Sequence, residues 1–268
     1  MPFDPVPPDA AIQLTDELAA PPSDAPAKRE AQEQVRGLTD RLDQLQEALY
    51  AEGKRALLVI LQGRDTSGKD GATRKVFGPL NPQGLVVTGF KVPTPVERSH
   101  DFLWRIHQAV PPAGSIGIFN RSQYEDVLVV RVHQLVSEEV WRPRYEQINN
   151  FERMLTANGV TILKFYLHIS RAEQRERLAA RLEDPSKYWK FSAGDLDERQ
   201  RWDEYTAAYE EMLRRTSTAW APWYLVPADK KFYRDLFVAE VVTRTLSSMA
   251  PQYPGPPDGL EELRRRLV

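Results

Sequence analysis

Five short apolar runs, separated by sequence that favours helices, constrain the fold of this chain more than any other feature. Runs of this kind, rich in Val, Ile and Leu, are typical of strands buried on both faces. Their alternation with helical sequence predicts one α/β domain, with a five-stranded parallel sheet between two helical layers in a three-layer α/β/α arrangement. The runs lie at Ala56–Leu61, Leu85–Phe90, Ser115–Phe119, Thr161–Ile169 and Trp223–Val226.

The N-terminal part of the chain divides into an arm and a helix. The first 27 residues are rich in Pro, Ala and Asp and lack periodicity, so we expect residues 1–30 to form a flexible or loosely wrapped arm. Residues 31–268 are then a single domain. A stripe of apolar residues at spacings of three and four predicts an amphipathic helix, packed on the body or at a subunit contact. The stripe is Val35, Leu38, Leu42, Leu45 and Leu49.

Composition excludes several classes of function. The chain has no cysteine, which rules out disulfides, thiol catalysis and thiolate metal sites. The formal net charge of -2 gives no whole-molecule attraction to nucleic acid, so a polyanion must be met by local clusters of Lys and Arg. No apolar run approaches the ~20 residues that cross a bilayer, and no secretory signal begins the chain. We therefore expect a soluble cytoplasmic protein with no membrane or nucleic-acid partner.

The sequence GRDTSGKD at residues 63–70 has the Gly-x4-Gly-Lys spacing of a phosphate-binding loop. It directly follows a predicted buried strand and precedes a predicted helix, the context in which backbone N–H groups point at phosphate oxygens. Lys69 adds a positive charge. The alternative is an ordinary glycine-rich turn. The expected phosphate-binding residues are Gly63, Thr66, Ser67, Gly68, Lys69, Asp70 and Gly71.

Two carboxylates make this loop unusual. Asp70 stands where the usual loop has the Ser or Thr that holds magnesium, and we expect a structural or supporting role for it. Asp65 lies inside the loop, where a negative side chain repels phosphate unless a divalent cation intervenes or the carboxylate accepts a proton. Asp65 is therefore predicted to be a magnesium ligand or a catalytic base. The alternative is an Asx-type turn residue that points away from the ligand.

A second polar segment follows the third predicted strand, at the sheet edge where parallel sheets bind ligands. Arg121 can hold a phosphate with its planar guanidinium. Asn120 occupies the place where phosphate-loop kinases commonly have a carboxylate, so Glu125 or Asp126 is the expected source of negative charge. The alternative is a helix start whose acids face the helix dipole.

A basic, interrupted helical segment at about residues 171–200 predicts a lid that closes over phosphates and excludes water. Pro and Gly interrupt the sequence DPSKYWKFSAGD at its centre. The alternative is a solvated surface whose arginines pair with neighbouring glutamates. The candidate lid cations are Arg171, Arg177, Arg181, Lys187 and Lys190, and Lys91 is a further candidate phosphate contact.

Four ordered motifs resemble the polyphosphate kinase 2 family, whose members use inorganic polyphosphate to phosphorylate nucleotides. The resemblance covers roughly Leu38 to the last strand and helix. It implies a thymidylate-kinase-like P-loop kinase fold, a mobile lid, dependence on Mg²⁺ with Mn²⁺ as a substitute, and a homo-oligomer, either dimer or tetramer. The motifs are GRDTSGKDG at Gly63–Gly71, KVPTPVERSHDFLWRIH at Lys91–His107, FNRSQYED at Phe119–Asp126 and RLEDPSKYWKFSAGD at Arg181–Asp195.

The resemblance also assigns roles. Asp65 and Lys69 correspond to central residues of the catalytic loop, and Arg121 corresponds to a phosphate contact. Members specialised for nucleoside diphosphates have Asp and Asn where this chain has Asn120 and Glu125. The chain is more similar to the branch that accepts AMP as well as ADP and so catalyses both steps to ATP. Glu125 then joins Asp65 as an expected metal ligand and catalytic carboxylate. The alternatives are a conventional nucleoside or nucleotide kinase that uses ATP as donor, and a non-catalytic phosphate-binding module.

Overall fold

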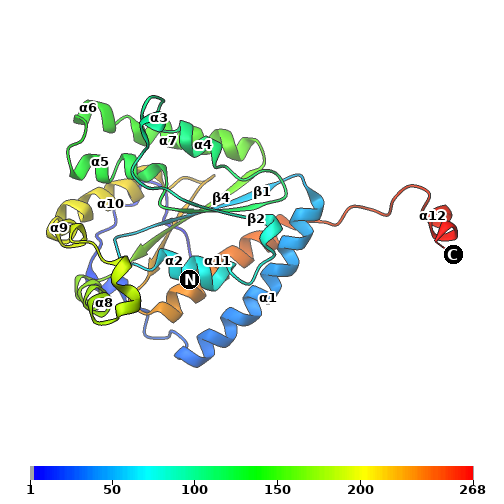
Figure 1. Ribbon diagram of the computed structural model, residues 1–268, viewed down its shortest axis with the longest axis horizontal. Coiled ribbons are helices and arrows are strands. Elements are labelled where there is room, and N and C mark those ends of the chain that lie inside the picture. Colours follow the sequence, from blue (N-terminus) through cyan, green and yellow to red (C-terminus); the bar gives the residue numbers. More distant parts are fainter. Residues whose placement is uncertain (1–2, 268) are drawn as a thin grey trace.

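The computed structural model describes residues 3–267 of the chain. Its five strands form one sheet in the order β2-β3-β1-β4-β5, and every neighbouring pair is parallel (Figure 1). The predicted five-stranded parallel sheet is confirmed, with each strand within two residues of its expected bounds. The strands are β1 Ala56–Gln62, β2 Leu85–Gly89, β3 Ile116–Asn120, β4 Val160–His168 and β5 Trp223–Pro227.

Helices cover both faces of the sheet, which confirms the three-layer arrangement (Figure 1). The alternation of side chains along β1 divides the interior into two cores. Leu58 and Ile60 belong to one core, and Leu57, Val59 and Leu61 belong to the other. The first core is closed by α4 Trp104–Gln108, α5 Val129–Val132, α6 Glu138–Trp141, α7 Arg144–Ala157 and α10 Trp202–Thr216, and the second by α1 Lys28–Glu52, α2 Lys69–Ala72 with its π-helical continuation Thr73–Phe77, and α11 Lys231–Met249.

Strand β2 departs from the expectation that every strand is buried on both faces. It lies at the edge of the sheet and pairs only with β3. Val86 and Val87 are 38% and 52% exposed. An apolar run alone does not distinguish an edge strand from a central one, because the strand order depends on how the crossovers are arranged.

The N-terminal arm follows a defined path along the body up to the start of α1. Val6 is buried, its N–H donates to the Trp223 carbonyl at 2.7 Å, and its own carbonyl accepts from the Ser217 hydroxyl. A short 3₁₀ turn, η1 Asp16–Ala19, follows in the arm. The Thr15 carbonyl lies 2.8 Å from Nε2 of the buried His168. The arm is therefore wrapped onto the end of the sheet.

Helix α1 confirms the predicted amphipathic helix and packs along α11 (Figure 1). The stripe residues at 35, 42, 45 and 49 are buried. At the other terminus, an extended segment after α11 carries the short helix α12 Leu260–Arg266 away from the body (Figure 1). Within residues 3–267, no helix combines the length and the apolar character that a membrane crossing needs.

Candidate active site

The predicted phosphate loop connects β1 to α2 at the carboxyl end of the central strand. Gly63 and Gly68 have φ angles of 151° and 101°, which only glycine adopts readily. A Cβ atom at Gly63 would lie 2.7 Å from the Leu167 carbonyl oxygen, and one at Gly68 would overlap the Arg234 guanidinium. Both glycines are therefore required by the turn and by the close approach of neighbouring groups.

Lys69 lies at the start of α2 and folds back onto the loop. Its Nζ donates to the carbonyls of Gly63 at 2.7 Å and Arg64 at 3.2 Å. Burial, together with the nearby charge of Arg121, lowers the pKa of Lys69 to about 8. The hydroxyls of Thr66 and Ser67 are buried and have no hydrogen-bond partner among the residues described. Buried polar groups are normally paired. The loop therefore holds an ammonium group and two hydroxyls that an anion can satisfy.

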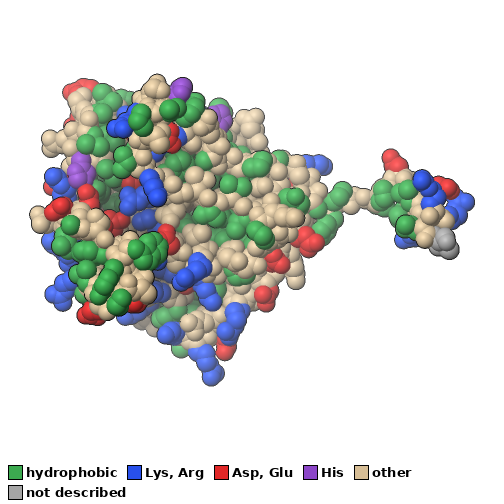
Figure 2. Space-filling model, viewed as in Figure 1, with side chains coloured by type: hydrophobic (Ala, Val, Ile, Leu, Met, Phe, Trp, Pro, Cys, Tyr) green, Lys and Arg blue, Asp and Glu red, His purple; other side chains and the backbone are tan. Residues whose placement is uncertain are grey.

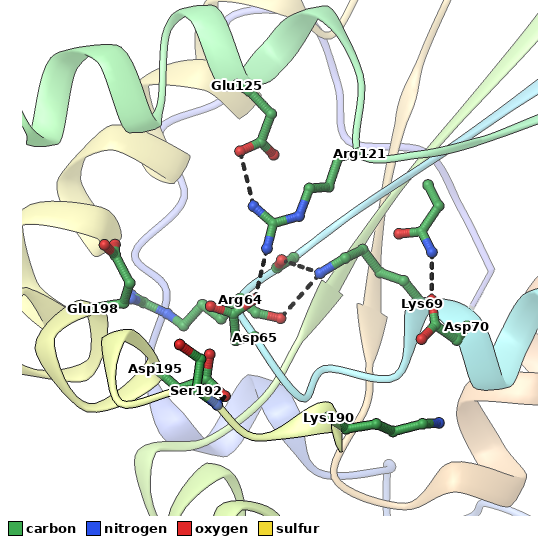
Figure 3. A network of polar contacts seen from close by, with 12 residues as sticks. Arg64, Asp65, Lys69, Asp70, Arg121, Glu125, Lys190, Ser192, Asp195 and Glu198 are labelled. Atoms are coloured by element: carbon green, nitrogen blue, oxygen red, sulfur yellow. Dashed lines mark hydrogen bonds and ion pairs between the residues drawn. The ribbon is translucent and has the colours of Figure 1, made fainter. Parts of the chain in front are cut away.

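Arg121 joins two of the predicted acids. Its Nη2 lies 2.7 Å from Asp65 Oδ1 in the loop, and its Nη1 lies 3.2 Å from Glu125 Oε2 (Figure 3). The charge of Glu125, with a further contribution from Asp65, raises the pKa of Arg121. Arg121 has a φ angle of 64° in the left-handed region, which is unusual for a residue other than glycine and is often found at functional sites. This turn directs the guanidinium back toward the loop.

The two acids that the sequence left as alternatives point in different directions. Glu125 faces Arg121, while Asp126 turns away toward Arg144, at 3.1 Å, and Arg105, at 3.9 Å. Burial raises the pKa of Asp126 to about 6 in spite of these two arginines. The geometry therefore favours Glu125 as the carboxylate of the site.

A buried polar network holds this segment, η4 Gln123–Asp126, in place. The side-chain amide of Gln123 and the hydroxyl of Tyr124 both donate to Glu152 Oε1, at 2.9 and 2.7 Å. Lys164 Nζ, completely buried, donates to Glu152 Oε2 at 2.6 Å and to the Tyr124 hydroxyl at 2.8 Å. Sequence reasoning missed this network. Its one signal was a lysine at the centre of the mostly apolar strand β4.

Asn120 and Asp70, the two positions where the sequence departs from the usual pattern, contact each other. The Asn120 amide donates to Asp70 Oδ1 and so links the end of β3 to the start of α2. The amide therefore lies at the strand end and the carboxylate in the loop. This contact is compatible with a supporting role for Asp70, which also lines a groove beside the phosphate loop.

The predicted lid consists of α8 Arg171–Glu183, the 3₁₀ segment η5 Pro185–Lys190 and α9 Gly194–Gln200. Arg177 anchors its base to the site. Its Nη1 donates to the carbonyls of Thr66 at 2.9 Å and Ser67 at 3.2 Å, and its Nη2 donates to the Ala228 carbonyl at 2.6 Å. Nε pairs with Glu173. The guanidinium therefore ties α8 to the loop.

The remaining lid cations are less firmly held. Lys187 pairs with Asp184 at the surface, and Lys190 is exposed and extends away from Asp195 (Figure 3). Arg181 pairs with Asp195 at 3.2 Å. All three cations line the groove beside the phosphate loop.

Arg171 differs from the other lid cations. Its side chain is exposed and lies 6.0 Å from the Trp202 ring centroid, and it is not among the described residues that line the groove.

The groove has a volume of about 660 Å³ and contains more cations than the sequence indicated. Lys91 lies on it as expected. Arg234 of α11, only 3% exposed, packs its guanidinium against Gly68 and Gly71 and pairs with Asp235 at 2.6 Å. The cations that sequence reasoning missed are Arg74, Lys75, Lys231 and Arg234. The signal for the last two was the basic start of the helix after the final strand.

A second, smaller cavity of about 190 Å³ lies on the other side of Arg121. Trp202, Tyr205 and Tyr209 of α10 line it. The Arg64 guanidinium lies 3.8 Å from the Trp202 ring centroid, a cation–π contact. Asp65 and Arg121 line both cavities, so these two residues stand where a cationic groove meets an aromatic-lined cavity.

The carboxylates of this site are suitable ligands for a magnesium ion that is shared with phosphates. Among residues 3–267, no group of three or more His, Asp or Glu side chains could hold a metal by itself. Magnesium at phosphoryl-transfer sites usually takes one or two carboxylates together with substrate phosphates. Asp65 fits this role because it lines both cavities and is 26% exposed. Arg121 lies between Asp65 and Glu125, so one ion shared by both acids would have to displace its guanidinium.

Comparisons with known proteins agree with the motifs. A family model described as polyphosphate kinase 2 matches residues 25–254. A protein of Meiothermus ruber named AMP/ADP-polyphosphate phosphotransferase is 52% identical over 236 residues, covering 88% of each chain. A Rhodopseudomonas palustris protein named ADP-polyphosphate phosphotransferase is 48% identical over 240 residues, covering 85% of this chain and 83% of that one. The crystal structure of polyphosphate kinase 2 from Arthrobacter aurescens TC1 matches with a TM-score of 0.89 and 42% identity, over 99% of this chain and 98% of that one.

Proposed function

Because this chain belongs to the polyphosphate kinase 2 family, we propose that it transfers a phosphoryl group from inorganic polyphosphate to AMP and to ADP, giving ADP and ATP. The transfer is reversible and requires Mg²⁺. Two relatives, named AMP/ADP-polyphosphate phosphotransferase and ADP-polyphosphate phosphotransferase, support both the donor and the acceptors.

The observation that carries the proposal is the junction of two unlike cavities at Asp65 and Arg121. The groove of about 660 Å³, lined by cations, suits a chain of phosphates. The aromatic-lined cavity suits a nucleoside, since bases stack on aromatic rings. A donor in the groove and an acceptor in the cavity would bring their terminal phosphates together at the junction.

The residues of the loop position the reacting phosphates. Phosphoryl transfer depends mainly on positioning and charge neutralisation. Lys69 exchanges the carbonyls of Gly63 and Arg64 for phosphate oxygens, and the N–H groups at the start of α2 bind the same anion. The bond between the terminal phosphorus of polyphosphate and its bridging oxygen breaks, and that oxygen stays on the shortened polyphosphate chain. An oxygen of the AMP or ADP phosphate forms the new bond to the transferred phosphorus.

Arg121 and Asp65 act at the junction. Arg121 keeps its contact with Glu125 and turns from Asp65 to the phosphate, so that it neutralises charge on the group in transfer. Asp65 thereby becomes available to hold Mg²⁺, whereas Glu125, the second acid expected to bind the metal, stays paired with Arg121 in this arrangement. When bound there, the ion supplies charge neutralisation between the two phosphate groups. At neutral pH the acceptor oxygen is already largely ionised, so a general base contributes little.

The lid completes the site in this proposal. Lys187 and Lys190 are exposed and lie on the 3₁₀ segment between α8 and α9, whereas Arg177 holds the base of the lid on the loop. Closure of the outer part would bring the exposed cations onto the phosphate chain and exclude water.

The expected homo-oligomer, either dimer or tetramer, is checked by measuring the mass of the purified protein by light scattering.

Incubation of the purified protein with AMP, Mg²⁺ and polyphosphate, followed by separation of the nucleotides, tests this function. We expect ADP and then ATP, and no product when polyphosphate is omitted. A conventional kinase would instead transfer phosphate from ATP without polyphosphate.

The Asp65→Asn variant tests the metal role, because an amide retains the shape of the side chain and loses the charge that attracts Mg²⁺. We expect turnover to fall by about 100-fold or more, the size of effect that removal of one electrostatic group produces at many active sites. Asp43→Asn, on the exposed face of α1 and outside both cavities of the site, changes charge equally and serves as the control. A normal rate for Asp65→Asn with Mg²⁺ would exclude the role.

A further inference from the structure

A second cationic cavity continues the groove away from the phosphate loop. It has a volume of about 460 Å³ and lies between the starts of α1 and α11. Lys75, Lys231 and Asp235 line both this cavity and the groove, so the two are continuous. Lys and Arg side chains gather over this part of the molecule, beside the lid and α1 (Figure 2). We call it the distal cavity, and its lysines are Lys28, Lys75, Lys230 and Lys231.

The three acids that line the distal cavity each have a partner, either an arginine or a backbone N–H. Glu173 pairs with Arg177 at 2.8 Å, and Asp235 pairs with Arg234 at 2.6 Å. Asp229 accepts a hydrogen bond from the backbone N–H of Ser170 at 2.8 Å.

The four lysines, in contrast, are exposed, and none forms an ion pair or a side-chain hydrogen bond with another residue of the part of the chain that the structure describes. Asp229 keeps its negative charge, because its partner is a neutral backbone N–H, but the four lysines outnumber it and the cavity has a net positive charge.

The charges around Lys231 indicate a site for an anion. Partial burial lowers the pKa of Lys231, and the neighbouring cations Arg177 and Arg234 lower it further. Glu173 offsets part of this effect, and the excess of positive charge around Lys231 favours a bound anion. Helix α11 begins at Lys231, runs for 19 residues and has no acid in its first turn, so its N-terminal dipole also faces the cavity with positive charge.

We propose that the distal cavity binds the far part of a condensed phosphate chain whose reacting end lies at Lys69. Lys75 and Lys231 connect the two regions, and Lys28 and Lys230 hold phosphates that a short chain does not reach. The protein therefore selects long polyphosphate over short polyphosphate. This inference rests on the proposed function, since it extends the donor site of that reaction.

The double variant Lys28→Gln/Lys230→Gln tests the proposal, because both residues lie in the distal cavity and outside the groove at the loop. With long-chain polyphosphate we expect KM to rise about tenfold, the combined effect of two exposed charge contacts, with kcat unchanged. With tripolyphosphate we expect the same KM and kcat as in the parent protein. The rise in KM for the long chain should shrink at high salt, which screens exposed charges.

The variant Lys54→Gln/Arg266→Gln removes the same two charges at exposed positions outside both cavities and serves as the control. It should leave KM for long chains within about twofold of the parent value. Equal KM values of the parent and the Lys28/Lys230 variant for long chains would overturn the proposal, and so would an equal rise for tripolyphosphate.

Two further outcomes distinguish failure of this inference from failure of the proposed function. A rise in KM for AMP or ADP alone, with polyphosphate unaffected, would assign the cavity to a nucleotide and overturn the inference. Absence of polyphosphate-dependent transfer in the parent protein would refute the proposed function itself, and this is seen before any variant is made.

Discussion

The charge of Lys69 should make phosphate binding depend on pH in the range of an ordinary assay. Its ammonium is buried beneath the loop, and burial, together with the positive charge of Arg121, lowers the pKa to about 8. A lysine in water titrates at about 10.4 and would stay charged throughout this range. Only the protonated form attracts phosphate, so the ligand-free protein loses binding capacity as pH rises through 8.

The size of the effect follows from the pKa. With a pKa of about 8, roughly 90% of Lys69 is protonated at pH 7 and roughly 10% at pH 9. Since kcat/KM reports the titration of the unliganded enzyme, kcat/KM for polyphosphate should fall about tenfold between these two values. The kcat at saturating polyphosphate should change less, because bound phosphate holds the lysine in its charged form.

The assay is initial-rate kinetics from pH 6.5 to 9.5 at constant ionic strength and constant free Mg²⁺. The variant Lys69→Arg is the matched comparison, because its guanidinium stays charged across the range and its profile should lack the alkaline decline, even if its absolute rate is lower. A flat kcat/KM profile in the parent protein, or an identical decline in Lys69→Arg, would refute the reasoning.

Two further predictions concern the parts that support the loop and the arginine. Gly68→Ala should lower kcat/KM at least tenfold, because a Cβ atom there meets the Arg234 guanidinium and the φ angle of 101° strains any side chain. Steady-state rates, together with a thermal melt, would show whether activity falls while the fold persists. Glu152→Gln alone leaves the Lys164 ammonium buried without its carboxylate and should cost about 3–5 kcal/mol in urea unfolding. The double variant Glu152→Gln/Lys164→Met should recover much of the lost free energy of unfolding, because the buried charge is gone while the Gln oxygen still accepts a hydrogen bond from Tyr124. A double variant no more stable than the single one would contradict this account.

Local patterns predicted those parts of the site that are continuous in sequence. The strand before residue 63 and the helix after it specify the loop, because the spacing of its glycines and Lys69 is set by the geometry of one turn. The position of Arg121 at the end of β3 also followed from sequence, since parallel strands end at a common edge. Four ordered motifs, one of them in the lid segment, were enough to identify the family.

The choice between Glu125 and Asp126 could not be made from the chain alone. Both follow Arg121 within one short turn, and either could have faced it. The buried network at Glu152, which holds Tyr124, sets the rotation of that turn, so that Glu125 faces the site while Asp126 packs against Arg144. The partners come from α7 and β4, and their approach depends on packing that no local pattern encodes.

The sequence by itself determined the layered fold, the phosphate loop and the chemistry of its ligand, because periodicity and short-range spacing are properties of neighbouring residues. Tertiary structure alone decided which strand lies at the edge, which further cations join the predicted ones in the groove and where the groove leads. Arg234 reaches the loop, and Lys231 the groove, from a helix more than 150 residues away along the chain. Their electrostatic effect depends on distance in space, and only the packing of α11 against α2 and α1 sets that distance.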